Sequence, residues 1–289
     1  MQLFARQIEQ LTLRNAKYRQ FALSTLIQAY AADVGTYDVT TALLGLRQKQ
    51  LVTAEIRAKE AGIVAGLSEC ELFWRKYGIT VELLKKDGAT VRCGEVLVRL
   101  RGSAAAILTT ERTALNLLQR MSGIATATNR LVQLVGQNRV AGTRKTPFGL
   151  LDCRAIVVGG GLPHRLNLAD QILVKENHLA VDPECWKRIR TKDFFEIEAD
   201  NEKLAIEIAE YYKERGGKLI LLLDNFTPPK LKKLVPQLRR IHPSIILEAS
   251  GGITPKNIQA YLAVGVDYVS LGYLTHSSRA LDLSLRVYQ

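Results

Sequence analysis

The chain has 289 residues, 47% of them hydrophobic and 24% charged, which is the composition of a globular protein with a full core. This length suits two ordinary domains or one large barrel. Lysine and arginine number 40 against 28 aspartates and glutamates, so the net charge is +12. Such an excess points to an anionic partner: nucleic acid, an acidic membrane surface or an anionic small molecule.

The cysteines and the hydrophobic runs narrow the class of protein further. Cys70, Cys93, Cys153 and Cys185 form no C-x-x-C pair and no His/Cys spacing typical of a zinc site. We interpret them as reduced thiols of a cytoplasmic protein. Residues 1–6 lack the long apolar core of a signal peptide, and no run approaches the roughly 20 apolar residues of a membrane helix.

The first part of the chain predicts a small α+β domain. Helical periodicity covers residues 3–31, and a turn follows at 33–38. Alternating apolar and polar residues predict a strand at 52–58, and a helical run covers 68–77. Short strands are expected at 81–84, 90–91 and 96–100, and a long helix from Ala104 to about Val135.

Beyond residue 138 the pattern becomes regular, because apolar strands alternate with helical stretches. Each strand ends in polar residues or glycine; the strands are 139–141, 172–174, 194–198, 219–223, 245–248 and 268–271. Helices are expected between them, for example at 202–212 and 255–263. This rhythm is typical of a β/α-barrel, whose chemistry lies at the carboxyl ends of its strands. A doubly wound open sheet is the alternative, but it would not need polar residues after every strand.

Basic side chains concentrate between Gly142 and His178. Arg144 and Lys145 follow one strand and Lys175 follows another, while Arg154, His164 and Arg165 flank the triple glycine 159–161. A cluster of this kind suits a substrate with several negative groups. The alternative interpretation is a solvated loop with ordinary lysines.

The later strand ends carry a different chemistry. Ser250-Gly251-Gly252 and Gly272 offer open backbone amides, which predict a phosphate site; otherwise these glycines only make tight turns. Glu198 and Asp224 suggest Mg²⁺ shared with substrate phosphates, or else ion pairs with neighbouring cations. Glycoside hydrolysis also uses paired carboxylates, but neutral sugars do not need the surrounding cations.

Taken together and in this order, the motifs resemble those of quinolinate phosphoribosyltransferase (nicotinate-nucleotide pyrophosphorylase, carboxylating). They run over most of the chain, and only jointly are they specific. The matching motifs are Glu-Arg-Thr-Ala-Leu-Asn at 111–116, Thr-Arg-Lys-Thr at 143–146, Gly-Gly-Gly at 159–161 with His164-Arg165, Leu-Val-Lys-Glu-Asn-His at 173–178, Leu-Asp-Asn-Phe at 223–226, Glu-Ala-Ser-Gly-Gly at 248–252 and Thr-His-Ser at 275–277.

The resemblance implies an α/β fold: an incomplete, seven-stranded β/α-barrel (122–276) with an N-terminal α+β domain (1–121) that the tail 277–289 joins. The alternating apolar positions at 281–287 also favour packing of this tail on the first domain. The implied reaction transfers phosphoribose from phosphoribosyl pyrophosphate to quinolinate, with Mg²⁺, and gives nicotinate mononucleotide, CO₂ and pyrophosphate, a step of de novo NAD biosynthesis. We see no evident nucleophile and expect no covalent enzyme intermediate.

The resemblance also implies roles for individual residues. Quinolinate's carboxylates would be bound by Arg112, Arg144, His164, Arg165 and Lys175. Glu198 and Asp224 would hold the ribose and Mg²⁺. The 5′-phosphate would be held by Ser250, Gly251, Gly252, Gly272 and His276. Thr143 would add a substrate contact, and the implied catalytic set is Lys145, Lys175, Glu198 and Asp224.

Arg112 has a special place in this expectation. In the family the matching arginine reaches the active site of the neighbouring subunit, which implies a homodimer or an assembly of dimers. Two segments depart from the family pattern: Pro147–Leu151 lacks an arginine that is usual there, and Ala32-Asp33 replaces the usual Glu-Asp. A related phosphoribosyltransferase encoded with molybdate transporters, acting on another aromatic acceptor, is therefore the alternative. A nucleic-acid-binding protein is a more distant alternative, because the prominent cations gather at strand ends and do not line one helix.

Overall fold

The computed structural model describes residues 4–46, 50–215 and 217–288, which form two compact units. The barrel unit comprises Leu131–Thr146 and Gly161–Ser277 with residues 4–7, and the N-terminal unit comprises Ile8–Arg130 and Pro147–Gly160 with residues 278–288. The units interleave along the chain, and the helix α5 (Ala104–Val135) contributes to both. Residue 3, where the first helical pattern begins, lies outside the described residues.

The barrel unit contains a parallel sheet of six strands in the order β6-β11-β10-β9-β8-β7. Its strands are β6 (Val140–Ala141), β7 (Ile172–Val174), β8 (Phe194–Ala199), β9 (Lys218–Asp224), β10 (Ile246–Ser250) and β11 (Tyr268–Ser270). From β7 to β11 each strand lies beside the one before it, and the first strand, β6, pairs with the last. This order is that of a barrel, because a doubly wound sheet reverses its strand order part-way.

Leu162 marks the place of a further barrel strand. It forms an isolated parallel bridge with Ala141, so among the described residues only a single bridge extends the sheet beyond β6. The predicted fold class, an incomplete β/α-barrel with an N-terminal α+β domain, is confirmed.

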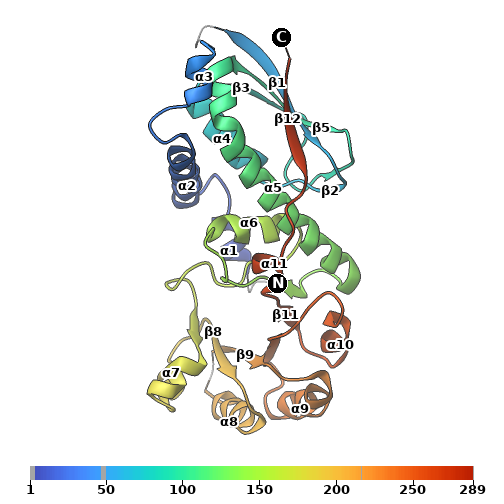
Figure 1. Ribbon diagram of the computed structural model, residues 1–289. Helices are drawn as coiled ribbons and strands as arrows, with labels where there is room; N and C mark the ends of the chain where they lie inside the picture. The colour runs from blue at the N-terminus through green and yellow to red at the C-terminus, as the bar shows by residue number, and fades with distance from the viewer. Residues whose placement is uncertain (1–3, 47–49, 216, 289) are drawn as a thin grey trace. The chain divides into compact units, whose positions relative to one another are not determined.

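Helices connect the strands of the barrel unit and cover their outer side (Figure 1). They are α7 (Glu176–Val181), the 3₁₀ turn η1 (Cys185–Arg188), α8 (Glu202–Tyr212), α9 (Pro228–Ile241), α10 (Ile258–Ala263) and α11 (Tyr273–His276). The Asn201 side chain caps α8 by accepting the Leu204 N–H at 2.9 Å. In α9, two prolines open the helix, and its buried residues recur at the spacing of one helical face.

The strand register decides which side chains can meet at the mouth of the barrel. Glu196 and Glu198 lie on one face of β8, and Glu248 and Ser250 on one face of β10, because side chains alternate along a strand. Leu222 pairs with both Glu198 and Glu248, and Ser250 pairs with Asp224. The inner face therefore carries polar groups both at its carboxyl end and deeper in the barrel.

The N-terminal unit is built on an antiparallel sheet of four strands in the order β12-β1-β5-β3. Its strands are β1 (Leu51–Ala58), β3 (Thr80–Leu83), β5 (Val96–Ser103) and β12 (Leu283–Tyr288), with a separate pair of β2 (Gly62–Ile63) and β4 (Thr90–Val91). The helices are α2 (Ala16–Val34), α3 (Val39–Leu43), α4 (Leu67–Lys76), most of α5, and α6 (Leu150–Val158), and α1 (Ala5–Gln10) contributes residues to both units.

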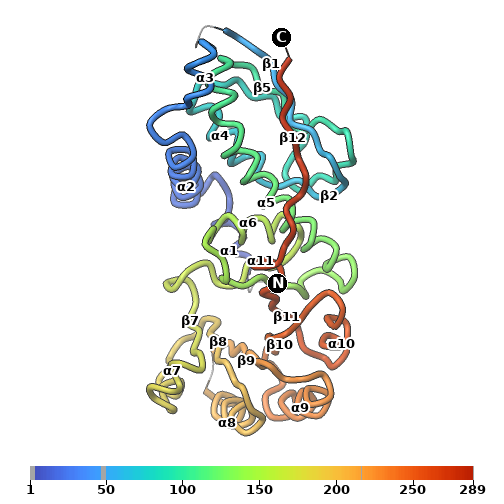
Figure 2. The backbone as a smooth tube through the Cα atoms, in the orientation of Figure 1, coloured from blue at the N-terminus to red at the C-terminus, as the bar shows by residue number. Residues whose placement is uncertain are grey.

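The tail returns to this first part of the chain. Figure 2 shows β12 running beside β1, and the two strands pair antiparallel from Thr53 and Tyr288 to Ala58 and Leu283. None of the four cysteines, all of which lie in the described residues, forms a disulfide. No helix in the described part of the chain is both long enough and apolar enough to cross a membrane.

Candidate active site

A cavity of about 620 Å³ opens at the carboxyl ends of the barrel strands. Every site residue expected from the sequence lines it, with the exception of Arg112. Those residues are Thr143, Arg144, Lys145, His164, Arg165, Lys175, Glu198, Asp224, Ser250, Gly251, Gly252, Gly272 and His276. The sequence analysis did not select Glu176, Thr254, Ser270 or Tyr273, which line the cavity as well.

One side of the cavity is strongly cationic. Arg144 and Lys145 follow β6, Arg165 follows the Leu162 bridge, and Lys175 follows β7. Burial lowers the pKa of Arg165, and the nearby charge of Arg144 lowers it further. The two guanidinium groups thus repel each other, and an anion with two carboxylates would relieve that repulsion.

Carboxylates face these cations from β8 and β9. The Glu198 Oε2 atom lies 3.8 Å from Lys175 Nζ. Burial raises the pKa of Glu198, and the charge of Asp224 raises it further, against the lowering effect of Lys175. Burial likewise raises the pKa of Asp224, although Lys145 opposes the shift. Crowded carboxylates of this kind are suited to a hard cation that shares its other positions with substrate oxygens.

Glycines give the third side of the cavity an open backbone. Gly251 has a φ of +87°, and a Cβ there would lie 2.1 Å from Asn225 Oδ1. A Cβ on Gly272 would lie 2.6 Å from His276 Nε2. Gly251 therefore requires glycine, whereas a side chain at Gly272 would first have to displace the His276 ring. The open backbone at both positions suits close approach of a phosphate.

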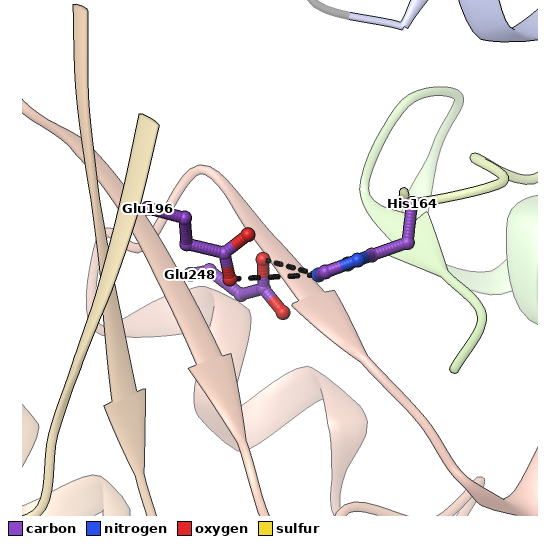
Figure 3. Close-up of side chains that lie close together, drawn as sticks. All are labelled: His164, Glu196 and Glu248. Carbon is purple, nitrogen blue, oxygen red and sulfur yellow. Dashed lines mark ion pairs between the residues drawn. The ribbon is translucent and has the colours of Figure 1, made fainter. Parts of the chain in front are cut away.

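His164 lines the cavity, and its ring faces Glu196 and Glu248 (Figure 3). Its Nε2 atom is 3.5 Å from Glu196 Oε1 and 3.4 Å from Glu248 Oε2. Its Nδ1 atom accepts the backbone N–H of Arg165 at 2.9 Å. Sequence reasoning missed Glu196 and Glu248, although glutamates inside buried strands are unusual enough to serve as a signal.

Part of the cluster expected between Gly142 and His178 lies elsewhere. Arg154 belongs to α6 in the N-terminal unit, where its Nε atom is 3.8 Å from Glu69 Oε1. Gly159 ends α6, and a Cβ there would lie 2.5 Å from the Ala125 carbonyl oxygen, so this glycine serves helix packing. Neither residue lines the cavity. Arg112 is an exposed residue of α5 in the N-terminal unit.

Comparison with known families identifies this arrangement. The profile described as "Quinolinate phosphoribosyl transferase, C-terminal domain" matches residues 124–286, and the corresponding N-terminal domain matches 38–122. The chain belongs to the quinolinate phosphoribosyl transferase family. It is 40% identical over 250 residues, 82% of this chain and 95% of the relative, to a probable nicotinate-nucleotide pyrophosphorylase [carboxylating] of Archaeoglobus fulgidus.

Further relatives agree with this family membership. A probable enzyme of the same name from Bacillus subtilis is 38% identical over 273 residues, 89% of this chain and 90% of the relative. The structure of nicotinate-nucleotide pyrophosphorylase from Ehrlichia chaffeensis matches with a TM-score of 0.81 and 29% identity, over 92% of this chain and 98% of that one. That from Francisella tularensis matches with a TM-score of 0.78 and 30% identity, over 93% and 97%.

As a quinolinate phosphoribosyl transferase, the chain is a pentosyltransferase of NAD biosynthesis, as the sequence predicted. The alternative of a molybdate-transport-associated enzyme with another acceptor is not favoured by these matches.

Proposed function

We propose that the barrel cavity binds quinolinate on its cationic side and phosphoribosyl pyrophosphate on its glycine-rich side, with Mg²⁺ between them. The observation that carries this proposal is the distribution of charge in one cavity: crowded cations after β6 and β7, and crowded carboxylates after β8 and β9. Two polyanionic substrates can lie side by side only where cations offset their repulsion.

Quinolinate recognition is assigned to the basic residues. Arg144 and Arg165 present planar guanidinium groups, which match carboxylates with paired hydrogen bonds. Lys145 and Lys175 add positive charge at the neighbouring strand ends. In this proposal quinolinate relieves the repulsion that lowers the pKa of Arg165.

The sugar substrate is assigned to the later strands. Ser250, Gly251, Gly252, Gly272 and His276 would hold the 5′-phosphate. Glu198 and Asp224 would hold the ribose hydroxyls and share Mg²⁺ with the pyrophosphate. Their raised pKa values support this assignment, because a cation removes the repulsion between two ionised carboxylates. When bound, Mg²⁺ would neutralise charge that develops on the departing pyrophosphate.

The reaction then needs little covalent chemistry from the protein. The chain's cations orient the quinolinate nitrogen toward the sugar carbon that loses pyrophosphate. Once the nitrogen is alkylated, its positive charge stabilises the electron pair that the ring carbon keeps when the neighbouring carboxylate leaves as CO₂, and that carbon then takes up a proton from solvent. Lys145 and Lys175 are placed to stabilise negative charge at the reacting end of the cavity.

We also propose that the enzyme is a homodimer, or an assembly of dimers, and that Arg112 completes the site of the partner subunit. The exposed position of Arg112 on α5 leaves its guanidinium available to such a partner. A two-fold interface would supply it twice, once to each site. The four free cysteines support the cytoplasm as the compartment.

The direct test is a spectrophotometric assay with quinolinate, phosphoribosyl pyrophosphate and Mg²⁺. We expect nicotinate mononucleotide, CO₂ and pyrophosphate in equal amounts, and loss of turnover when the metal is chelated. Nicotinate in place of quinolinate serves as the control acceptor, since it lacks the carboxylate that leaves. Absence of nicotinate mononucleotide with quinolinate would reject the proposed function.

A further inference from the structure

Three titratable residues meet inside the barrel, below the cavity: His164, Glu196 and Glu248. His164 is 8% exposed, and both glutamates are fully buried. Neither glutamate lines the cavity, so neither is in reach of a substrate there. Inward positions of barrel strands usually carry branched apolar side chains, and two buried carboxylates are costly unless something balances them. Their presence here therefore indicates a specific role for the two glutamates.

The imidazole of His164 uses both of its nitrogen atoms within the protein. Nε2 faces the two carboxylates at 3.5 and 3.4 Å, as Figure 3 shows. Nδ1 accepts the Arg165 N–H at 2.9 Å. A ring nitrogen accepts a hydrogen bond only when it carries no proton, so the proton of the neutral ring must be on Nε2, directed at the glutamates.

The cluster has the residue types of a metal site, but the hydrogen bond at Nδ1 argues against a metal. A metal on Nε2 would displace the ring proton to Nδ1, because a neutral metal-bound imidazole keeps its proton on the other nitrogen. A proton on Nδ1 would point at the Arg165 N–H. The observed geometry therefore fits an Nε2–H group that faces both carboxylates at ion-pair distance.

The two carboxylates favour a proton on the imidazole. Burial lowers the pKa of His164, but Glu196 and Glu248 raise it by more, to well above its ordinary value. Burial raises the pKa of Glu248, but His164, Ser270 and Tyr268 together outweigh that effect and hold it below its ordinary value. The raised pKa favours protonation of both nitrogen atoms, but a proton on Nδ1 would have to displace the hydrogen bond from the Arg165 N–H, so the geometry opposes that second proton and leaves Nε2 as the protonated atom.

The bond at Nδ1 holds a strained turn. His164 has a φ of +57°, a left-handed conformation that is unfavourable for a residue with a side chain. Asp170 secures the far side of this turn by accepting the Leu166 N–H at 2.9 Å. Arg165, a half-buried cation that lines the cavity, lies between the hydrogen bond at His164 and the hydrogen bond at Leu166. The imidazole is thus the near anchor of the turn that aims the Arg165 guanidinium.

We propose that Glu196 and Glu248 are positioning residues for the acceptor: they fix His164 as the Nε2–H tautomer, and His164 in turn fixes Arg165. This inference rests on the proposed function, because it assigns Arg165 to quinolinate. It predicts an effect confined to the acceptor side of the cavity. The glycine side, where phosphoribosyl pyrophosphate is expected, does not depend on this turn.

Kinetics separate positioning from mere stability. Glu248→Gln keeps the shape of the side chain and removes its charge, and we expect the KM for quinolinate to rise about tenfold, as for a displaced binding group. The KM for phosphoribosyl pyrophosphate should change less than about twofold. Glu196→Gln should act in the same direction.

Glu69→Gln is the matched control, because Glu69 is an equally buried glutamate whose Oε1 accepts the Tyr18 hydroxyl proton at 2.8 Å in the N-terminal unit. It should lower the melting temperature without changing the KM for quinolinate. If both KM values rise together in Glu248→Gln, or if neither rises, the positioning role is wrong.

A spectroscopic test on the wild-type protein does not depend on turnover. The ¹⁵N spectrum of the His164 ring, assigned with a His164→Asn variant, should show a protonated Nε2 and an unprotonated Nδ1. Metal analysis of the same sample should find no tightly bound transition metal at this cluster. A protonated Nδ1, or a metal lost in His164→Asn, would overturn the proposal even if the quinolinate assay succeeds. If that assay fails while the tautomer is as expected, it is the proposed function that fails.

Discussion

Replacing Gly251 by alanine tests the glycine side of the site most directly. Gly251 has a φ of +87°, and an added Cβ would lie 2.1 Å from Asn225 Oδ1 and 2.9 Å from the Asn225 backbone nitrogen. The next residue offers a matched control. Gly252 has a φ of +62°, but a Cβ there would meet nothing within 4 Å.

The geometry gives the size of the expected effect. Real Cβ contacts are essentially never closer than 3.0 Å, so the Asn225 amide must move by at least 3.0 − 2.1 = 0.9 Å. That amide donates to Asp224 Oδ2 at 2.6 Å. Losing a hydrogen bond to a charged group costs about 1.5–3 kcal/mol. A left-handed alanine costs about 1–2 kcal/mol more.

We therefore expect Gly251→Ala to lower kcat/KM for phosphoribosyl pyrophosphate by about 70-fold to 5000-fold, which corresponds to the combined cost of about 2.5–5 kcal/mol. Gly252→Ala carries only the backbone cost and should lower it by about tenfold. Initial rates with varied phosphoribosyl pyrophosphate at saturating quinolinate and Mg²⁺ measure both effects. Equal losses in the two variants would show that the contact with Asn225 does not matter, and an unchanged Gly251→Ala enzyme would remove this loop from the site.

Three further changes test the other parts of the site. Arg144→Ala and Arg165→Ala should each raise the KM for quinolinate by about 10-fold to 100-fold, since each removes a charged hydrogen-bond donor. Phthalate should compete with quinolinate for the wild-type enzyme. Unchanged KM values in both variants would exclude the two arginines from the quinolinate site. Asp224→Asn should reduce turnover and raise the Mg²⁺ requirement, and full activity at low Mg²⁺ would make Asp224 structural. Because burial raises the pKa of Asp224, its ionised form destabilises the fold at pH 7. The variant should therefore melt at an equal or higher temperature at that pH. Homodimers of Arg112→Ala and of Lys175→Ala should each be nearly inactive. Their mixed dimer, confirmed by differential tagging, should recover up to about half of the wild-type activity, because one of its two sites carries neither change. Absence of rescue would place Arg112 outside the partner's site.

The sequence was most informative where the hydrophobic pattern was long or repeated. The helix expected from Ala104 to about Val135 occupies Ala104–Val135, and the strand expected at 172–174 occupies Ile172–Val174. The barrel strands were recognisable because parallel strands buried on both faces read as apolar runs that end in polar residues. Their order could not be read from such runs, since it depends on which strand edges meet in space.

The segment 147–160 shows why the substrate cluster was drawn too widely. Its residues lie between two strands that carry site residues, so sequence proximity favoured Arg154 and the triple glycine as part of the site. In the structure this segment forms α6 and belongs to the N-terminal unit. Gly159 serves helix packing and Arg154 faces Glu69, and neither fact has a local signature in the sequence.

The buried glutamates illustrate the opposite error. Glu196 precedes Glu198 by two residues, so both lie on the same face of β8, but only Glu198 reaches the cavity. Alternation along the strand therefore predicts that the two side chains share a face, but it does not predict which of them reaches the cavity. Depth depends on the register with β9 and on the place of His164, which is distant in sequence and held by its own strained turn.

The two halves of the site are joined where the barrel brings its first strand beside its last. The cations follow β6, the Leu162 bridge and β7, whereas the glycines of the expected phosphate loops follow β10 and β11. β6 pairs with β11, and beyond this pairing the hydroxyl groups of Thr143 and Thr275 lie 3.1 Å apart. Neighbouring strand ends thus set the cations proposed to bind the acceptor beside the glycine loops proposed to bind the sugar phosphate, an arrangement that suits transfer between two anions. The barrel holds the two sides of the cavity together through backbone pairing between its strands. The charged side chains are therefore available to bind the substrates and are not needed to hold these two sides together.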